Sequence, residues 1–265
     1  MKIAVITIAG VSSRFNEGVP EEEKRHKIIY YEGNREDTLL YHLLEKCGSF
    51  DHIVLVGGNR YDEVQDYCDK LPGDMKTRIE LVYNEHYADL ASGYSLYVGL
   101  KAIFETYEND SIEEILFVEG DLDIDRDSFD TVVSCKSDVL TYNYEPIYSN
   151  KAVVLYRDGT GSYRYAFNSS HGLLRIDEPF SMILNSGQMW KFTDIEKLKV
   201  ANDIFYSDNK SGTNLCIIQE YIDQQRDDDP RIIGLKRWTN CNTREDYRRI
   251  LTYWNYDRSA DISES

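Results

Sequence analysis

The sequence lacks an excess of positive charge. Its 265 residues contain 30 lysines and arginines against 47 aspartates and glutamates, which gives a formal net charge of −17 at pH 7. Proteins that bind nucleic acids without sequence preference place cations on the phosphates and release counterions. A surface with this net charge repels polyanions, so the composition argues against a nonspecific nucleic-acid-binding protein.

Long hydrophobic runs and a cysteine framework are also missing. The longest apolar run near the N-terminus, Ile3 to Ala9, follows Lys2 and is too short for a bilayer span or a signal peptide. The 5 cysteines are an odd number and include no C-x-x-C pair, which argues against a disulfide framework or a zinc cluster. We therefore expect a soluble, cytoplasmic protein without membrane insertion, whose cysteines are reduced and mostly structural.

The first half of the sequence alternates strand patterns with helix patterns. Short, continuously apolar runs of the kind that parallel sheets bury on both faces occur at 3–8, 52–56, 79–83 and 115–118. Helical spacing occurs between them, at 39–47, 61–70 and 95–105. Right-handed crossovers between such strands build an α/β fold with a doubly wound, mostly parallel sheet flanked by helices. Its ligand sites are expected at the carboxyl ends of the strands.

Beyond Asp138 the pattern changes to shorter strand-like segments separated by turns, at 152–156, 163–167 and 181–184. These segments predict a smaller antiparallel portion that covers the substrate. Three helices are expected after it, each opening with threonine at the N-cap position, at 193–202, 213–225 and 243–253. We expect one domain over residues 1–257, followed by a flexible tail at 258–265.

A loop of small residues, Ala9-Gly-Val-Ser-Ser-Arg14-Phe15, follows the first strand. Small side chains let backbone N–H groups approach a phosphate, and Arg14 adds a cation. Lys27, at the end of a charged stretch, offers a second cation to the same anion. An ordinary turn between strand and helix is the alternative interpretation, because Gly10 is the only glycine of the loop.

A run of alternating acids follows the fourth strand, in Glu119-Gly-Asp121-Leu-Asp123-Ile-Asp125-Arg-Asp127. Neighbouring carboxylates repel each other unless a cation, most simply Mg²⁺, neutralises them. Asp121 and Asp123 lie nearest to the strand end and are the candidate metal ligands. Asp125 and Asp127 are interpreted as stabilising the N-terminus of the helix that follows.

The loop and the acidic run together resemble the nucleotidyltransferases that activate phosphorylated small molecules. Their opening motif is L-A-G-G-x-G-x-R-hydrophobic with a downstream P-K, which is similar to Ile8-Ala-Gly-Val-Ser-Ser-Arg14-Phe15 and His26-Lys27-Ile28. Asp121-Leu-Asp123 resembles the metal-binding acid pair of the family. The second loop glycine is absent here, and His26 stands where proline is usual before the lysine.

Within that family the sequence most resembles bacterial phosphocholine cytidylyltransferases. Their N-x-x-Y-x-x-x-N-x-x-S-L segment is similar to Asn84-Glu-His-Tyr87-Ala-Asp-Leu-Ala-Ser92-Gly-Tyr94-Ser-Leu96, although Leu90-Ala-Ser-Gly93 replaces the polar asparagine stretch. The similarity continues through Asn185-Ser-Gly-Gln-Met-Trp190, Glu220 and Asn242-Thr-Arg-Glu-Asp-Tyr247, so it covers nearly the whole chain.

The resemblance implies a Rossmann-like nucleotidyltransferase domain with a nucleotide-binding half at 1–137 and an acceptor-binding half at 138–257. It implies Mg²⁺ on Asp121, Asp123 and Glu220, and catalytic cations on the nucleotide phosphates at Arg14 and Lys27. The residues expected at the nucleotide are Ile8, Ala9, Gly10, Val11, Ser12, Ser13, Asn84 and Ser92. Those expected at the acceptor are Tyr87, Tyr94 and Trp190. A solvated helix face is the alternative for Glu220, and ordinary packing is the alternative for the aromatic residues.

The implied reaction is attack by a phosphate oxygen of an acceptor such as phosphocholine on the α-phosphorus of a nucleoside triphosphate, with CTP favoured, and release of pyrophosphate. Such a product is a precursor for cell-surface polysaccharides or lipids. A sugar-1-phosphate uridylyl- or thymidylyltransferase would share the fold and the metal site. A glycosyltransferase would share an acidic pair but would not need Arg14 and Lys27. A regulatory protein that binds a nucleotide without turning it over is the third alternative.

Overall fold

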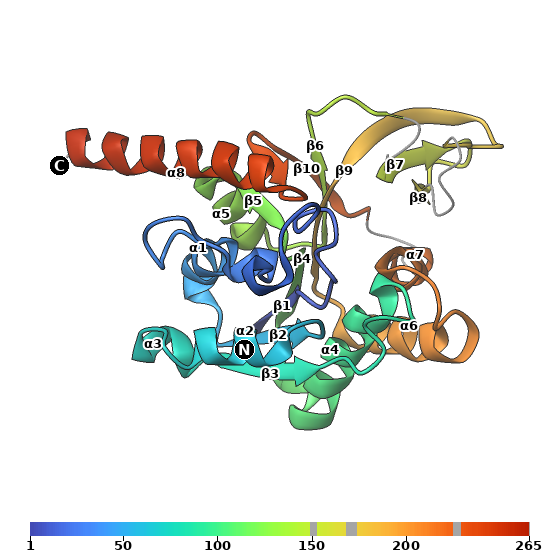
Figure 1. The fold of residues 1–265 in the computed structure, drawn as a ribbon. Coiled ribbons are helices and arrows are strands. Elements are labelled where there is room, and N and C mark those ends of the chain that lie inside the picture. Colours follow the sequence, from blue (N-terminus) through green and yellow to red (C-terminus); the bar gives the residue numbers. More distant parts are fainter. Residues whose placement is uncertain (149–152, 168–173, 225–228, 265) are drawn as a thin grey trace.

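The computed structural model describes residues 1–148, 153–167, 174–224 and 229–264. Within these ranges a nine-stranded sheet forms the centre of the molecule (Figure 1). Its strands are β1 (Lys2–Thr7), β2 (His52–Gly57), β3 (Ile79–Tyr83), β4 (Glu114–Glu119), β6 (Val139–Asn143), β7 (Val153–Asp158), β8 (Tyr163–Phe167), β9 (Phe180–Phe192) and β10 (Arg231–Leu235). A separate two-stranded sheet consists of β5 (Leu122–Ile124) and β11 (Trp238–Asn240).

The strand order of the main sheet is β10-β6-β9-β4-β1-β2-β3. Strands β1, β2, β3 and β4 are parallel, and Val5 in β1 lies opposite Val54 in β2 and Phe117 in β4. Strand β9 runs antiparallel to both β4 and β6. The N-terminal half of β9 pairs with β7, and β7 pairs with β8. The predicted doubly wound, mostly parallel sheet with a smaller antiparallel portion is therefore confirmed.

Helices pack on both faces of this sheet (Figure 1). One face carries α1 (Leu39–Lys46), α2 (Tyr61–Cys68), α3 (Gly73–Lys76), α5 (Arg126–Ser134) and α8 (Arg244–Glu264). The other face carries α4 (Ser92–Thr106), α6 (Ile195–Asp208) and α7 (Asn214–Asp223). The central residues of β1, β2 and β4 are apolar, as expected of strands that helices cover on both sides, which is why continuous apolar runs predicted these strands correctly.

Several predicted boundaries need correction. Strand β9 spans Phe180–Phe192, far beyond the predicted segment 181–184, because its polar middle is buried between β6 and β7. Helix α6 begins at Ile195, and its N-cap is Asp194, whose carboxylate accepts from the Lys197 backbone N–H at 3.1 Å. Residues 152 and 225, which the prediction placed in a strand and a helix, lie outside the described residues.

The C-terminal segment is also helical where the sequence predicted a flexible tail. Helix α8 continues through residue 253 to Glu264. The Arg258 guanidinium donates to the Asp37 carboxylate at 2.8 Å, which ties this part of the helix to the body of the protein. An ion pair that joins residues so distant in sequence leaves no local pattern, so the prediction missed it.

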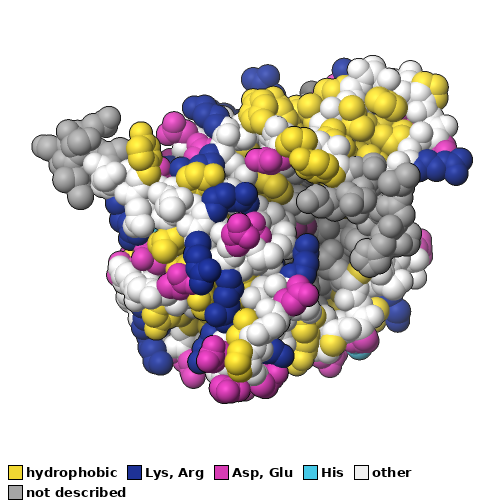
Figure 2. Space-filling view, turned by 45° about the horizontal axis from the view of Figure 1, so that its top comes forward, with side chains coloured by type: hydrophobic (Ala, Val, Ile, Leu, Met, Phe, Trp, Pro, Cys, Tyr) yellow, Lys and Arg dark blue, Asp and Glu magenta, His cyan; other side chains and the backbone are white. Residues whose placement is uncertain are grey.

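Hydrophobic side chains gather on the surface of the antiparallel portion, at the upper right of Figure 2. Exposed aromatic residues in this region include Tyr144, Tyr148 and Phe180.

Within the described residues, no helix is long and apolar enough to cross a membrane. The cysteines, all of which lie in the described ranges, are free, and Cys47, Cys68 and Cys241 are buried, as the odd count without C-x-x-C pairs predicted.

Candidate active site

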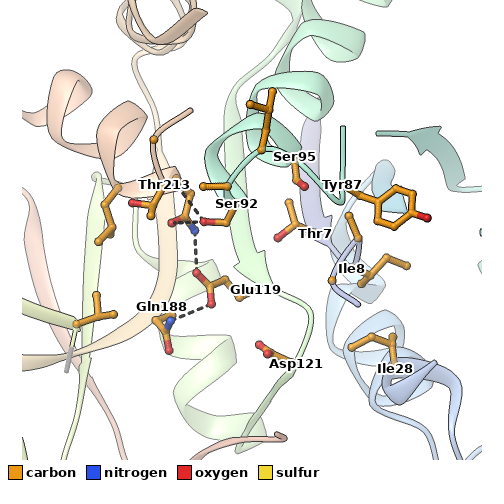
Figure 3. Close-up of a pocket in the computed structure, with 18 of the residues that line it drawn as sticks. Thr7, Ile8, Ile28, Tyr87, Ser92, Ser95, Glu119, Asp121, Gln188 and Thr213 are labelled. Atoms are coloured by element: carbon orange, nitrogen blue, oxygen red, sulfur yellow. Dashed lines mark hydrogen bonds between the residues drawn. The ribbon is translucent and has the colours of Figure 1, made fainter. Parts of the chain in front are cut away.

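A cavity lies where the order of the parallel strands reverses. Strands β1, β2 and β3 follow one another outward, whereas β4 lies on the opposite side of β1. In sheets of this kind ligands bind at such a point, outside the carboxyl ends of the strands. The cavity here has a volume of about 810 Å³ and is lined by the ends of β1 and β4 and by segments from the antiparallel half (Figure 3). This volume is in the range of small-molecule sites, roughly 300–1,000 Å³.

Lys27 is placed at this cavity by its neighbour His26. The His26 ring Nδ1 accepts from the Ile28 backbone N–H at 3.4 Å, and its Nε2 therefore carries the proton and donates to the Ile8 carbonyl at 2.9 Å. Burial lowers the pKa of His26 to about 4, so the ring is neutral. The φ of His26 is −69°, a value that proline also adopts, so histidine keeps a backbone conformation that proline would fit.

Lys27 and Asp121 form an ion pair inside the cavity. The Lys27 Nζ lies 2.6 Å from the Asp121 Oδ2, and the two side chains are 15% and 21% exposed. The Asp121 main chain is fixed by its carbonyl, which accepts from the Cys241 backbone N–H at 2.8 Å. The structure thus brings together the lysine after the first strand and the acid after the fourth, from positions 94 residues apart.

Glu119, which the sequence analysis did not assign, also lies in the cavity (Figure 3). Its carboxylate accepts from the Asn214 side-chain amide at 2.7 Å and from the Gln188 side-chain amide at 2.8 Å. Burial raises the pKa of Glu119, and the negative charge of Asp121 raises it further. Gln188 has a φ of +54°, in the left-handed region that favours glycine, so its side chain is held at the cavity by a strained backbone.

The donor set of the cavity fits Mg²⁺. Carboxylate oxygens come from Asp121 and Glu119, which lie near each other in Figure 3. No group of three or more His, Cys, Asp or Glu side chains arranged for a metal occurs among the described residues. Mg²⁺ commonly needs only one or two carboxylates, because water and substrate phosphates supply its other ligands. Asp121 is the first candidate, since both oxygens of Glu119 accept from amides.

Two helix N-termini form the opposite wall of the cavity. Helix α4 begins at Ser92 and α7 at Asn214, and the N-cap residues Ala91 and Thr213 make no side-chain cap bond of their own, but the Ser92 hydroxyl accepts from the Asn214 N–H at 3.3 Å. The two helices touch at their first turns, where the Gly93 N–H donates to the Gly212 carbonyl at 3.2 Å. A Cβ at Gly93 would lie 2.5 Å from the Gly212 oxygen, so this contact needs glycine. The first-turn N–H groups of Gly93 and Asn214 therefore already have partners within the protein, and what this wall offers an anion is the positive end of two helix dipoles.

The predicted phosphate loop lines the cavity with its first residues only. Ile8, Ala9 and Gly10 line the cavity, whereas Val11, Ser12, Ser13 and Arg14 do not. Ser12 has a φ of +56°, so the loop keeps a conformation typical of glycine although serine is present. Its hydroxyl accepts from the Lys27 backbone N–H at 3.4 Å. Arg14 is exposed and donates to the Asn242 side chain at 2.7 Å.

Asp123 is not at the cavity, and its assignment to the metal is wrong. Its side chain is 1% exposed and accepts from the Trp254 indole at 2.9 Å and from the Lys46 ammonium at 3.3 Å. Asp123 was chosen because it lies near the end of the fourth strand, but the chain turns at residues 120–121, and Asp123 belongs to β5. Asp125 is confirmed as the N-cap of α5, because its carboxylate accepts from the Ser128 N–H at 2.9 Å.

Trp190 is also misassigned. It is completely buried, stacks on Phe117 at 5.1 Å between ring centroids and donates its indole N–H to the Tyr165 hydroxyl at 2.7 Å. Glu220 is on α7, but this helix lines the cavity with residues of its first turn, and Glu220 is not among them. Trp190 lies in β9, which pairs with β4 and β6, and the sequence around it does not show that these strands bury it.

In the segment that resembles phosphocholine cytidylyltransferases, some of the predicted site residues line the cavity and others do not. Tyr87 and Ser92 line the cavity. Asn84 is buried, donates to the Ser95 hydroxyl at 2.9 Å and accepts from a backbone N–H, so it holds the segment in place and does not face a ligand. Tyr94 packs against the His86 ring at 5.0 Å and is not part of the cavity lining.

Solved structures of nucleotidyltransferases have the same fold. The CTP:phosphocholine cytidylyltransferase from Streptococcus pneumoniae (LicC) is 18% identical with a TM-score of 0.61, covering 94% of this chain and 97% of its own. The inositol-1-phosphate CTP transferase from T. maritima is 14% identical with a TM-score of 0.60, covering 93% and 91%. A UDP-glucose pyrophosphorylase complexed with UDP-glucose is 13% identical with a TM-score of 0.63, covering 97% and 99%.

These likenesses show that the predicted nucleotidyltransferase fold is correct. No curated protein matches the chain in sequence. A protein-family model described as a domain of unknown function (DUF6564) matches residues 23–254, which include Lys27, both cavity acids and the antiparallel half. The chain therefore belongs to the DUF6564 family and has the fold of the nucleotidyltransferases.

Proposed function

We propose that the protein is a Mg²⁺-dependent nucleotidyltransferase that transfers a nucleoside monophosphate from CTP to a phosphorylated small molecule such as phosphocholine and releases pyrophosphate. The observation that carries the proposal is the Lys27–Asp121 pair at 2.6 Å, in a cavity at the carboxyl ends of β1 and β4. The shared fold with nucleotidyltransferases of known structure supports the same reaction class.

The donor phosphates are proposed to bind beside Ala9 and Gly10, which line the cavity together with Lys27, so that backbone N–H groups and the ammonium can bind the same anion. Mg²⁺ bound at Asp121 would neutralise part of the triphosphate charge and stabilise the charge that develops on the α-phosphate. Arg14 is proposed to act on the outer phosphates from the exposed side of the same loop. Lys27 carries more of the catalysis because it lines the cavity and Arg14 does not.

In the proposed step an oxygen of the acceptor phosphate attacks the α-phosphorus. The bond between the α-phosphorus and the oxygen that bridges to the β-phosphate breaks, and pyrophosphate leaves with that electron pair. No general base is needed, because a phosphate monoester is already mostly ionised near neutral pH. The site then accelerates the reaction by holding the reactants in line and by stabilising charge.

The lining of the cavity also suits an acceptor with a positive group. Its titratable side chains among the described residues include Lys27, Asp121 and Glu119, and burial and the charge of Asp121 raise the pKa of Glu119 to about 7, whereas His26 is neutral. Tyr87 also lines the cavity and lies 6.5 Å from Tyr83 between ring centroids. Quaternary ammonium groups bind over aromatic rings, so Tyr87 is the ring proposed for a choline head.

The test is a panel of CTP, UTP, dTTP, ATP and GTP, each paired with phosphocholine, phosphoethanolamine and glucose 1-phosphate, with pyrophosphate release as the readout. We expect the fastest release with CTP and phosphocholine, and none without a divalent cation. Faster release from UTP or dTTP with the hexose phosphate would establish the sugar-nucleotide alternative. No release with any pair would favour a protein that binds a nucleotide without turning it over.

A further inference from the structure

We infer that Lys27 acts as the resident cation of the metal site in the ligand-free protein, and that a divalent cation competes with it for the Asp121 carboxylate. Nucleotide and metal would then bind cooperatively, because the triphosphate draws Lys27 away from the acid that the metal needs. The nucleotide part of this inference rests on the proposed function. The competition between lysine and metal is a property of the protein alone.

The pairing pattern of the cavity acids supports this inference. Both oxygens of Glu119 accept from neutral amides, those of Asn214 and Gln188. Asp121 is instead paired with an ammonium group, at 2.6 Å from its Oδ2. A divalent cation with Mg–O distances of about 2.1 Å would approach the same carboxylate. An ammonium and a dication on one carboxylate repel each other, so binding of the metal requires Lys27 to move.

Lys27 is built so that its side chain can move while its backbone stays fixed. The backbone is held by the Lys27 N–H bond to the Ser12 hydroxyl and by the neighbouring His26, whose ring bonds to the Ile8 carbonyl. The ammonium sits on a flexible four-carbon stem and is a compact point charge. The proposed phosphate position beside Ile8 and Gly10 is next to this anchor of the Lys27 backbone, because the His26 ring bonds to the Ile8 carbonyl, and it would give the ammonium a second anionic partner when nucleotide is bound.

The first experiment measures Mn²⁺ binding without nucleotide, from the electron paramagnetic resonance signal of free Mn²⁺. Lys27→Met is expected to bind Mn²⁺ at least about tenfold more tightly than the wild type, a change of about 1.4 kcal/mol. The matched control is Lys24→Met, which removes the same charge three residues earlier, from an exposed pair with Glu21 at 2.6 Å. We expect Lys24→Met to stay within about twofold of the wild type, because exposed pairs contribute little.

Two further variants define the site of the competition. Lys27→Arg retains the positive charge and is expected to bind Mn²⁺ as weakly as the wild type. Asp121→Asn in the Lys27→Met background is expected to lose the gain in affinity. The inference is overturned if Lys27→Met binds Mn²⁺ no more tightly than Lys24→Met, or if it shows no binding up to millimolar Mn²⁺ while circular dichroism shows it folded.

The second experiment measures binding of CTP in EDTA, where no metal is present. Asp121→Asn releases Lys27 and is expected to bind metal-free CTP more tightly than the wild type, and this gain should shrink in the Lys27→Met background. Equal gains in both backgrounds would mean that only repulsion by Asp121 was removed, and would contradict the coupling.

The two proposals fail separately. Tighter Mn²⁺ binding in Lys27→Met without pyrophosphate release by the wild type would preserve the competition and refute the proposed reaction. Release of pyrophosphate by the wild type, with unchanged Mn²⁺ binding in Lys27→Met, would do the reverse.

Discussion

Asp121 and Asp123 are two residues apart, yet the structure predicts opposite consequences when each is changed to asparagine. Asp121 is partly exposed in the cavity and pairs with Lys27 at 2.6 Å. Asp123 is 1% exposed and pairs at 3.3 Å with Lys46, which is itself 9% exposed. Asparagine is nearly isosteric with aspartate, so each substitution removes a negative charge with little change of shape.

Asp123→Asn leaves the buried Lys46 ammonium without its counter-charge. Removing one partner of a buried ion pair costs about 3–5 kcal/mol of unfolding free energy. For a protein of this size that corresponds to a Tm lower by roughly 10 °C. The Trp254 indole still has an oxygen acceptor in the asparagine side chain, so we expect the folded fraction to retain nearly wild-type turnover.

Asp121→Asn should behave in the opposite way. Its ion pair is only partly buried, so its loss should cost less unfolding free energy than loss of the Asp123 pair, about 1–2 kcal/mol. Loss of the charge that is proposed to hold Mg²⁺ should reduce turnover by about 10²–10³, the cost of removing one electrostatic element of an active site.

Thermal unfolding and steady-state pyrophosphate release on both variants provide the measurement. Lys46→Met combined with Asp123→Asn is the control, because removing both charges should recover part of the lost stability. The reasoning is refuted if Asp123→Asn reduces turnover as much as Asp121→Asn does, or if Asp121→Asn is the less stable of the two.

Further substitutions test other parts of the site. Lys27→Ala should lower the maximal rate at saturating CTP more than Arg14→Ala does, and Lys24→Ala should leave it unchanged; equal loss in Lys24→Ala would point to a general effect of charge. At pH 8, above the raised pKa of Glu119, Glu119→Gln removes a negative charge from the cavity and should raise the KM for phosphocholine by about tenfold, equivalent to about 1.4 kcal/mol; an unchanged KM would remove Glu119 from the acceptor site. Stability should fall as the pH falls from 6.5 towards 4, because residue His26 takes up a proton there in the unfolded chain but stays neutral in the folded protein, where its pKa is lowered to about 4. Between pH 7.5 and pH 5 the wild type should lose about 2 kcal/mol more unfolding free energy than His26→Gln does, as measured by denaturation. Equal losses in the two proteins would contradict this.

The sequence predicted the parts of the site that depend on local pattern. The apolar runs of β1 and β4 identified buried parallel strands, and the carboxyl ends of such strands meet at one edge of a sheet. This rule brings Asp121 to the end of β1, whereas Lys27 was placed there by its resemblance to the lysine of the nucleotidyltransferase motif. The N-cap at Asp125 was equally predictable, because a cap and its backbone N–H partner lie three residues apart.

The parts that were not predicted depend on contacts between distant segments. Glu119 is recognisable as a site residue only when Asn214 and Gln188, from α7 and β9, are placed beside it. The turn at residues 120–121 separates Asp121 from Asp123, and no periodicity of the acids reveals that turn. Trp190 matched a motif, yet its position in β9 between β4 and β6 buries it completely.

The most direct test of the proposed reaction follows one oxygen atom. Phosphocholine labelled with ¹⁸O in its phosphate is incubated with CTP, Mg²⁺ and the protein, and the product is examined by ³¹P NMR. If the acceptor phosphate attacks the α-phosphorus, one ¹⁸O becomes the bridging oxygen of a new diphosphate, both product phosphorus signals shift, and the released pyrophosphate is unlabelled. Labelled pyrophosphate, or release of CMP with no diphosphate product, would contradict the account.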